Sequence, residues 1–226
     1  MFTGLPSYLV ITFLAAVALT FQFFISASPN KKMPLLVMTA WLLVTAALAL
    51  SGFLSVTSGM PPRFFLVVVL PFLFIVFLLI TKKGQAFLES LDIRMLTLLH
   101  LVRVPVELSL YWLAAHKAVP ELMTFEGRNF DIIAGITAPV IYFVCFRGKE
   151  VKNRLVLLAW NLLCLGLLLN IVVNGILSAP FSFQRFAFDQ PNIAVLFFPF
   201  VWLPSFIVMV VFFSHLVVIG RLQKKA

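Results

Sequence analysis

Seven long apolar runs divide the sequence, and they constrain its fold more than any other feature does. The runs cover residues 8–26, 35–56, 64–80, 90–113, 130–146, 155–177 and 193–220. The hydrocarbon core of a bilayer is about 30 Å thick, and a helix crosses it in about 20 residues. Short segments rich in proline, glycine and lysine, such as Ser28–Lys32 and Thr81–Gly84, separate the runs. The pattern predicts an all-α integral membrane protein, with residues 1–226 forming one polytopic domain built as a seven-transmembrane-helix bundle.

Composition excludes an ordinary soluble domain. Hydrophobic residues make up 62% of the 226 residues and charged residues only 11%, whereas a soluble domain carries about 25% charged residues. The net charge of +9 would suggest a nucleic-acid partner in a soluble protein. Cys145 and Cys164 cannot form a disulfide framework, and both lie in apolar runs. We expect them to be small core residues.

The basic residues sort between alternate connections, and this sorting predicts an orientation. One side of the predicted membrane collects four of them: Arg63, Lys117, Arg128 and Arg185. The other side collects twelve: Lys31, Lys32, Lys82, Lys83, Arg94, Arg147, Lys149, Lys152, Arg154, Arg221, Lys224 and Lys225. Basic residues favour the cytoplasmic side of short loops, so we expect the N-terminus outside and the C-terminus in the cytoplasm, in the inner (plasma) membrane. Contact with anionic lipid then accounts for the positive charge, and we expect no nucleic-acid partner.

A weak internal similarity relates the first three runs to the last three. Ala40-Trp41 followed by Ser51–Ser55 resembles Ala159-Trp160 followed by Asn174–Ser178, and both stretches begin in the second run of a triplet. The similarity is compatible with a 3+1+3 arrangement, in which two parallel repeats flank an odd fourth helix. Repeats of this kind occur in transporters.

The fourth run carries charged side chains deep inside its apolar sequence. At about 100° per residue, His100, Arg103, Glu107 and Tyr111 fall within about 80° of arc, and Glu89 extends this stripe toward the cytoplasmic end. A charge at the centre of a span costs about 2.5–3.5 kcal/mol, which favours a functional role. We expect a solute or proton pathway with Glu107 as the titrating group. In the alternative interpretation Arg103 and Glu107 neutralise each other at their spacing of four, and His100 donates to a neighbouring carbonyl.

The connection between the fourth and fifth runs, His116–Asp131, mixes acidic, basic and apolar residues as a cap folded against a bundle would. The outer mouth of the pathway is expected at three of its residues: Glu121, Glu126 and Arg128. In the alternative interpretation this segment is only structural, and Asn129 and Asp131 cap the fifth helix.

Asn170 and Asn174 share one face in the outer half of the sixth run. Asparagine in a span usually bonds to another helix, and contact with a ligand is the second expectation. The candidate ligand or proton pathway therefore has nine members: His100, Arg103, Glu107, Tyr111, Glu121, Glu126, Arg128, Asn170 and Asn174.

Three histidines raise the question of a metal or haem. His116 lies 16 residues beyond His100, about 24 Å along a continuous helix, so the two cannot share a metal. His100 and His215 both fall in the cytoplasmic half, but no HxxxH, HExxH or CxxC pattern supports a site. We expect no metal and no cofactor, with a two-histidine haem or metal site at His100 and His215 as the alternative.

The sequence favours a multi-pass membrane protein that binds or transports a small solute through the polar site on the fourth helix, with proton coupling through Glu107. The expected partners are membrane lipid and a small-molecule solute or protons. One alternative is an intramembrane lipid-modifying enzyme, with Glu107 or Glu126 and a histidine as acid and base. The other is a structural or assembly subunit whose charged stripe docks a partner helix.

Overall fold

The long apolar runs form helices, and the breaks between them form short turns. The computed structural model describes residues 4–224. Its α-helices, in chain order, are α1 (Ser7–Ala27), α2 (Lys32–Leu50), α3 (Phe65–Ile80), α4 (Lys82–Ser90), α5 (Ile93–Leu99), α6 (Arg103–Ala115), α7 (Asp131–Cys145), α8 (Arg154–Leu177) and α9 (Val208–Lys224). The predicted all-α class is confirmed.

Short elements complete the chain. There are 3₁₀ turns at η1 (Phe53–Ser55), η2 (His100–Val102), η3 (Glu121–Met123) and η4 (Ala194–Leu196), and a π-helical turn at η5 (Leu203–Ile207). Strands β1 (Phe146–Arg147) and β2 (Glu150–Val151) pair antiparallel, with Phe146 opposite Val151, and this hairpin joins α7 to α8.

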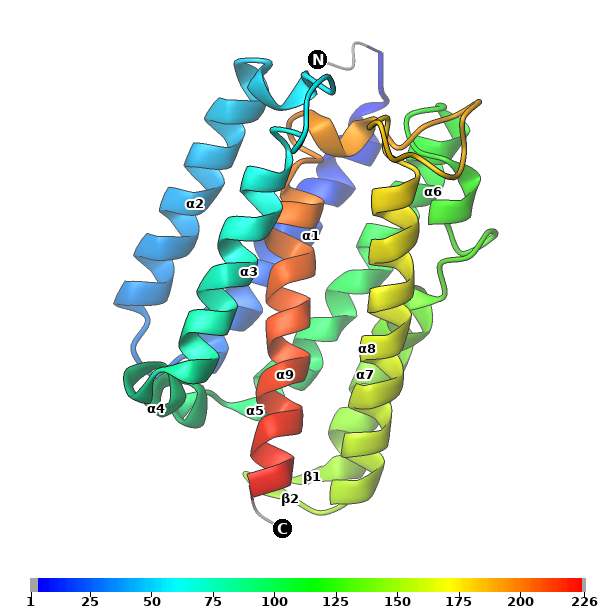
Figure 1. Ribbon diagram of the computed structural model, residues 1–226. Coiled ribbons are helices and arrows are strands. Elements are labelled where there is room, and N and C mark those ends of the chain that lie inside the picture. Colours follow the sequence, from blue (N-terminus) through cyan, green and yellow to red (C-terminus); the bar gives the residue numbers. More distant parts are fainter. Residues whose placement is uncertain (1–3, 225–226) are drawn as a thin grey trace.

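The long helices pack with their axes roughly along one direction, whereas the short helix α4 lies across one end of the bundle (Figure 1). Helix α1 packs on α5 and α6, α9 packs on α5 and α8, and α7 packs on α5, α6 and α8. Helix α2 stands at one side of the bundle (Figure 1). Helix α1 begins at the end of the bundle opposite to the one at which α9 ends.

Five helical segments of the described chain are long and apolar enough to cross a membrane. They are Ser7–Ala27, Lys32–Leu50, Ile93–Ala115, Arg154–Leu177 and Leu203–Lys224. The α3–α4 pair adds a sixth if the two helices are taken as one bent span, and α7 is a shorter apolar helix of 15 residues. These helices are compatible with a membrane bundle, whereas the count of seven spans and the orientation stay predictions.

Three of the predicted runs do not match the helices that form. The run 35–56 stops being α-helical at Leu50, because Gly52 adopts a left-handed conformation with φ 74° just after the helix end. The run 90–113 begins too early, since α4 ends at Ser90 and a new helix starts at Ile93. The run 193–220 is wrong in its first part, because it opens with a 3₁₀ turn and becomes helical only from Leu203.

A sharp bend of 92° separates α3 from α4. Thr81 lies at the bend in an extended conformation, and its side chain caps α4 by accepting from the Gly84 N–H at 3.2 Å. Gly84 packs directly on the Leu78 backbone, where a Cβ would collide with the carbonyl. Helix α4 therefore turns away from α3 and carries its charged residues to the end of the bundle.

The core closes around small residues where α6 and α7 approach each other. A Cβ on Gly135 of α7 would lie 2.8 Å from Val104 Cγ2 and 3.0 Å from the Val104 N on α6. Cys145 and Cys164 are free thiols that are 0% and 1% exposed, so their predicted role as small core residues is confirmed. The close approach of α6 and α7 brings the charged residues of the two helices together.

Candidate functional site

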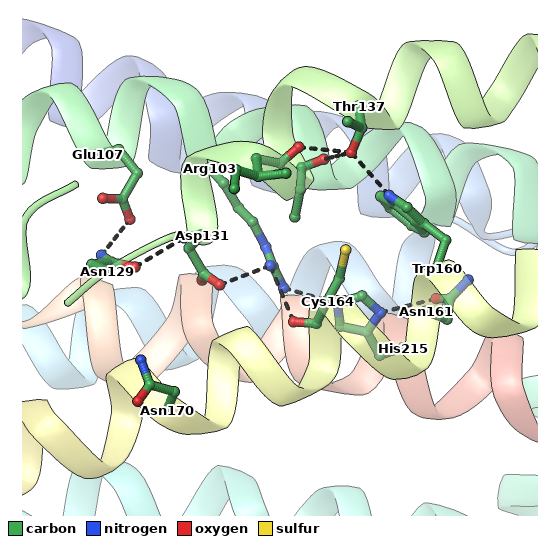
Figure 2. Close-up of polar contacts among 12 residues, drawn as sticks. Arg103, Glu107, Asn129, Asp131, Thr137, Trp160, Asn161, Cys164, Asn170 and His215 are labelled. Carbon is green, nitrogen blue, oxygen red and sulfur yellow. Dashed lines mark hydrogen bonds and ion pairs between the residues drawn. The ribbon is translucent and has the colours of Figure 1, made fainter.

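The buried guanidinium of Arg103 bonds to three other helices. Its Nη1 donates to Asp131 Oδ1 on α7 at 3.0 Å and to the Cys164 carbonyl on α8 at 3.4 Å. Its Nη2 lies 2.8 Å from His215 Nε2 on α9. Figure 2 shows the guanidinium between these groups. One side chain therefore ties α6 to α7, α8 and α9.

The hydrogen bonds of His215 assign its tautomer. Arginine can only donate, so His215 Nε2 accepts from Arg103. The hydrogen is then on Nδ1, which donates to Asn161 Oδ1 at 2.9 Å, and Asn161 Nδ2 donates to the Leu157 carbonyl at 2.8 Å. His215 is thus a neutral ring with both nitrogens bonded inside the bundle.

His100 is held by ring contacts. Its ring stacks on His215 with the centroids 4.0 Å apart and the planes at 22°, and it meets the edge of Trp160 at 5.3 Å. Trp160 itself donates from Nε1 to Thr137 Oγ1 at 2.9 Å. Neither ring nitrogen of His100 has a hydrogen-bond partner in the described part of the chain. The bond from His100 to a neighbouring carbonyl, which one interpretation required, does not form.

Glu107, which lies on α6 like Arg103, belongs to a second group of contacts. Its Oε1 accepts from Asn129 Nδ2 at 2.6 Å, while Oε2 is buried and has no donor among residues 4–224. Asn129 also donates to the Met123 carbonyl at 3.0 Å, and its Oδ1 accepts from the Asp131 N–H at 3.1 Å. Asn129 therefore connects Glu107 to the helix end that holds Asp131 against Arg103 (Figure 2).

A cavity of about 100 Å³ adjoins Glu107, between α3, α6, α8 and the start of the last helix. We call it the Glu107 cavity. Its walls are apolar except for four buried residues: Glu107, Asn129, Asp131 and Asn192. Asn192 donates to the Gly175 carbonyl at 3.3 Å, but its Oδ1 has no donor within the described chain. The volume exceeds the roughly 10–15 Å³ that one water molecule requires, so the cavity has room for a small polar molecule.

The predicted charged stripe does not form as one row. Arg103 pairs with Asp131 across two helices, so the Arg103–Glu107 pair of the alternative interpretation does not form. The 3₁₀ turn η2 at His100–Val102 changes the angular register of the helix just before Arg103. Glu89 lies on α4 and pairs with Lys224 at the exposed end of the bundle, so it does not extend the stripe.

The structure also separates the other predicted site residues from the Glu107 cavity. Six of them do not line it: Tyr111, Glu121, Glu126, Arg128, Asn170 and Asn174. Tyr111 stacks on Phe125 with the centroids 5.2 Å apart, and Glu121, Glu126 and Arg128 are exposed. Asn170 donates to the Arg128 carbonyl at 2.9 Å, and Asn174 donates back to the Asn170 carbonyl. Of the nine candidates, Glu107 lines the cavity, and His100 and Arg103 lie in the network beside it.

Five residues that complete these contacts were not among the nine candidates: Asn129, Asp131, Asn161, Asn192 and His215. Asn129 does cap α7 through the Asp131 N–H, as the structural interpretation expected, but both side chains also reach α6. An acidic residue at the second position of the apolar run 130–146 was the available signal for Asp131. No sequence pattern indicates that Asn161 meets His215 or that Asn192 lies near Glu107.

The donor atoms here do not suit a haem or metal held by two histidines. His100 and His215 do meet, but their rings lie face to face and both nitrogens of His215 already bond to Arg103 and Asn161. The described residues contain no group of three histidine, cysteine, aspartate or glutamate side chains that could hold a metal ion. A metal held by both histidines would have to displace the contact of His215 either with Arg103 or with Asn161.

A family model described as "Domain of unknown function (DUF8737)" matches residues 60–223. The match contains both the Arg103 network and the polar residues of the Glu107 cavity, whereas α1 and α2 precede it. No curated protein and no solved structure matches the chain. Since the match covers well over half of its length, the chain belongs to the family of the domain of unknown function DUF8737.

Proposed function

We propose that the protein is a seven-span membrane protein of the inner (plasma) membrane that binds or transports a small solute at the Glu107 cavity. The opposite ends reached by α1 and α9 support an odd number of crossings (Figure 1). Exposed lysines at the starts of α2 and α4 and near the end of α9 support a cytoplasmic location for that end. In this topology α7 is a span of 15 residues, about 22 Å long, and the Glu107 cavity lies in the outer half.

The observation that carries this proposal is a pair of unsatisfied acceptors. Glu107 Oε2 and Asn192 Oδ1 are both buried without a donor in the described chain, and both residues line the same cavity. Leaving a buried polar group unpaired costs about 1–3 kcal/mol, and more when the group is charged. A bound molecule that donates hydrogen bonds would remove this cost. The preferred ligand is therefore a small amine, alcohol or amide with an apolar body that fits the remaining walls.

Competition with a proton follows from the same geometry. Glu107 has one donor, Asn129, and the nearby charge of Arg103 is already bonded to Asp131. An ionised carboxylate with a single donor in an apolar cavity is unfavourable. The carboxyl group can keep its proton, or it can lose it and pair as a carboxylate with the ammonium of a protonated amine, and these two states exclude each other. This exclusion would link solute binding to proton release.

The geometry favours binding over acid–base catalysis. An enzyme of the expected kind needs a histidine beside the carboxyl group, but Glu107 and His215 lie on opposite sides of Arg103 (Figure 2). Both nitrogens of His215 are bonded, and Glu126 is exposed and does not line the cavity. His100, Arg103 and Glu107 are also buried within their own bundle, which favours a binding site over a surface for a partner helix.

A thermal-shift panel tests the proposal. Small amines, alcohols and amides would be added to detergent-solubilised wild type and to two variants, Glu107→Gln and Glu126→Gln. The second variant is a matched control, because it makes the same chemical change on an exposed residue outside the cavity. We expect at least one compound to stabilise wild type and Glu126→Gln but not Glu107→Gln. Equal stabilisation of all three proteins, or of none, would contradict the assignment.

A further inference from the structure

A second and larger hollow lies on the flank of the bundle. This apolar groove of about 680 Å³ runs between α2 and α3, with α9 as its floor and α4 at one end. We call it the lateral groove. Representative residues of its walls are Met33 and Val44 on α2, Leu70 and Leu78 on α3, and Met209 on α9. Helix α2 stands apart from α3 on this side of the molecule (Figure 1). The lateral groove is a different hollow from the Glu107 cavity, and Met209 of α9 is the one described residue that lines both.

Helix α2 is anchored at its middle to the start of the last helix. The Trp41 indole donates to the Ser205 carbonyl at 2.9 Å, and the Trp202 indole donates to the Leu42 carbonyl at 3.1 Å. These bonds hold the middle of α2 against the start of the last helix. The N-terminal part of α2, from Met33 onward, forms one wall of the groove.

The length of the groove matches one leaflet of a bilayer. Its wall on α2 extends from Met33 to Val44, a rise of about 16 Å at 1.5 Å per residue. Half of a hydrocarbon core about 30 Å thick is about 15 Å. The walls are apolar along this whole length, and Met33, Leu70 and Phe74 are each about half exposed or more. An acyl chain of one leaflet would cover these side chains from end to end.

Four lysines stand at the mouth of the groove. Lys31 and Lys32 immediately precede the wall residue Met33, and Lys82 and Lys83 lie between the wall residues Leu78 and Phe87. All four are exposed, and none forms an ion pair with another residue in the range 4–224. The acidic residue of α4, Glu89, is paired with Lys224 and does not neutralise them. The mouth is therefore strongly positive and the interior is apolar.

We propose that the lateral groove binds one anionic phospholipid, with acyl chains in the groove and the phosphate at the four lysines. Positive charge next to an apolar slot of one leaflet's length fits this class of molecule. A second copy of the chain fits poorly, because it would bring the same lysines to the mouth. The proposal rests on the chain's lying in a membrane, but it is independent of any ligand at the Glu107 cavity.

Native mass spectrometry of protein released from vesicles of equimolar phosphatidylglycerol and phosphatidylcholine tests this site. We expect wild type to retain one phosphatidylglycerol in preference to phosphatidylcholine. Two double variants, Lys31→Gln with Lys32→Gln and Lys82→Gln with Lys83→Gln, should lower this preference on the order of fivefold for each lysine removed. The matched control is Lys149→Gln with Lys152→Gln, which removes two exposed lysines from the hairpin region outside the groove. It should leave the preference unchanged.

A second pair of variants tests the acyl part of the site. Ala40 lines the groove, so Ala40→Phe should reduce retention of both lipids. Ala47 is exposed on the same helix but does not line the groove, so Ala47→Phe should retain lipid as wild type does. Equal retention of the two lipids by wild type, an equal loss in the hairpin control, or full retention by Ala40→Phe would overturn the proposal.

Discussion

Arg103 on α6 donates to Asp131 on α7 at 3.0 Å, and the two side chains are only 3% and 6% exposed. The sequence suggested a different partner, Glu107, four residues along the same helix. Because Arg103 is bonded to Asp131 and His215, one Glu107 oxygen has no donor in the described chain. The Arg103–Asp131 pair thus determines both how the helices are joined and where a ligand could bind.

Removal of Arg103 should destabilise the protein strongly. In Arg103→Met the Asp131 carboxylate loses its charged partner, and breaking one side of a buried pair costs about 3–5 kcal/mol. The double variant with Asp131→Asn should recover part of this loss. The measurement is denaturant unfolding in detergent, followed by circular dichroism. Lys224→Met, which removes an exposed pairing residue, should have little effect. A loss no larger than that of Lys224→Met would argue against the buried pair.

The contact between α6 and α7 should tolerate no added methyl group. Gly135→Ala places a Cβ against Val104, and overpacking of this kind costs about 1–3 kcal/mol. Gly166→Ala on α8 is the matched control, because its Cβ would meet no atom within 4 Å. The control should be neutral or gain up to about 1 kcal/mol from the better helix propensity of alanine. Equal melting temperatures for the two variants would show that the helices approach less closely.

His215 should be a neutral ring that carries its hydrogen on Nδ1. The reason is that Nε2 accepts from Arg103 while Nδ1 donates to Asn161. Nitrogen NMR of histidine-labelled protein distinguishes the two tautomers directly, and His215→Gln assigns the signal. In Asn161→Leu the Nδ1–H loses its acceptor, which should cost about 1–3 kcal/mol of stability. A signal from an Nε2–H tautomer would refute the proposed direction of the Arg103 bond.

The pKa of Glu89 should lie below its ordinary value of 4.5, mainly because Lys224 donates a hydrogen bond to the carboxylate and also attracts it by charge. The pair therefore stabilises the folded protein above that ordinary value, and the contribution is lost as the pH falls through the lowered pKa. Lys224→Gln should return the pKa of Glu89 toward 4.5, as measured by NMR titration. An unchanged titration would mean that the two groups do not interact in solution.

The helices were predictable because each apolar run is long enough to cross a bilayer or to be buried in a bundle. Most helix boundaries also coincide with breaks that contain lysine or proline. The errors arose where backbone conformation, not hydrophobicity, ends a helix. Gly52 stops α2 by its left-handed conformation, and Thr81 starts a new helix at a right angle to the previous one. A hydropathy pattern carries no signal for either event.

The site was predictable only in part, because periodicity on one helix cannot reveal partners on another. Glu107 and Arg103 were recognisable because a charged residue within an apolar run is energetically unfavourable. Their true partners, Asn129 and Asp131, were interpreted as helix caps, since an acid and an amide at a helix start usually have that role. The position of Asn192 beside Glu107 depends on the path of a loop, which local sequence does not specify.

Proton release on ligand binding tests the central claim most directly. Wild type, Glu107→Gln and the control Glu126→Gln would be titrated in weakly buffered detergent with the most stabilising amine of the panel, at a pH at which the amine is protonated, while a pH-sensitive dye reports released protons. Wild type and Glu126→Gln should release protons as they bind, because the ammonium group of the ligand pairs with the Glu107 carboxylate and so replaces its proton. Glu107→Gln should bind weakly and release none. Proton release from Glu107→Gln equal to that of wild type would contradict the account.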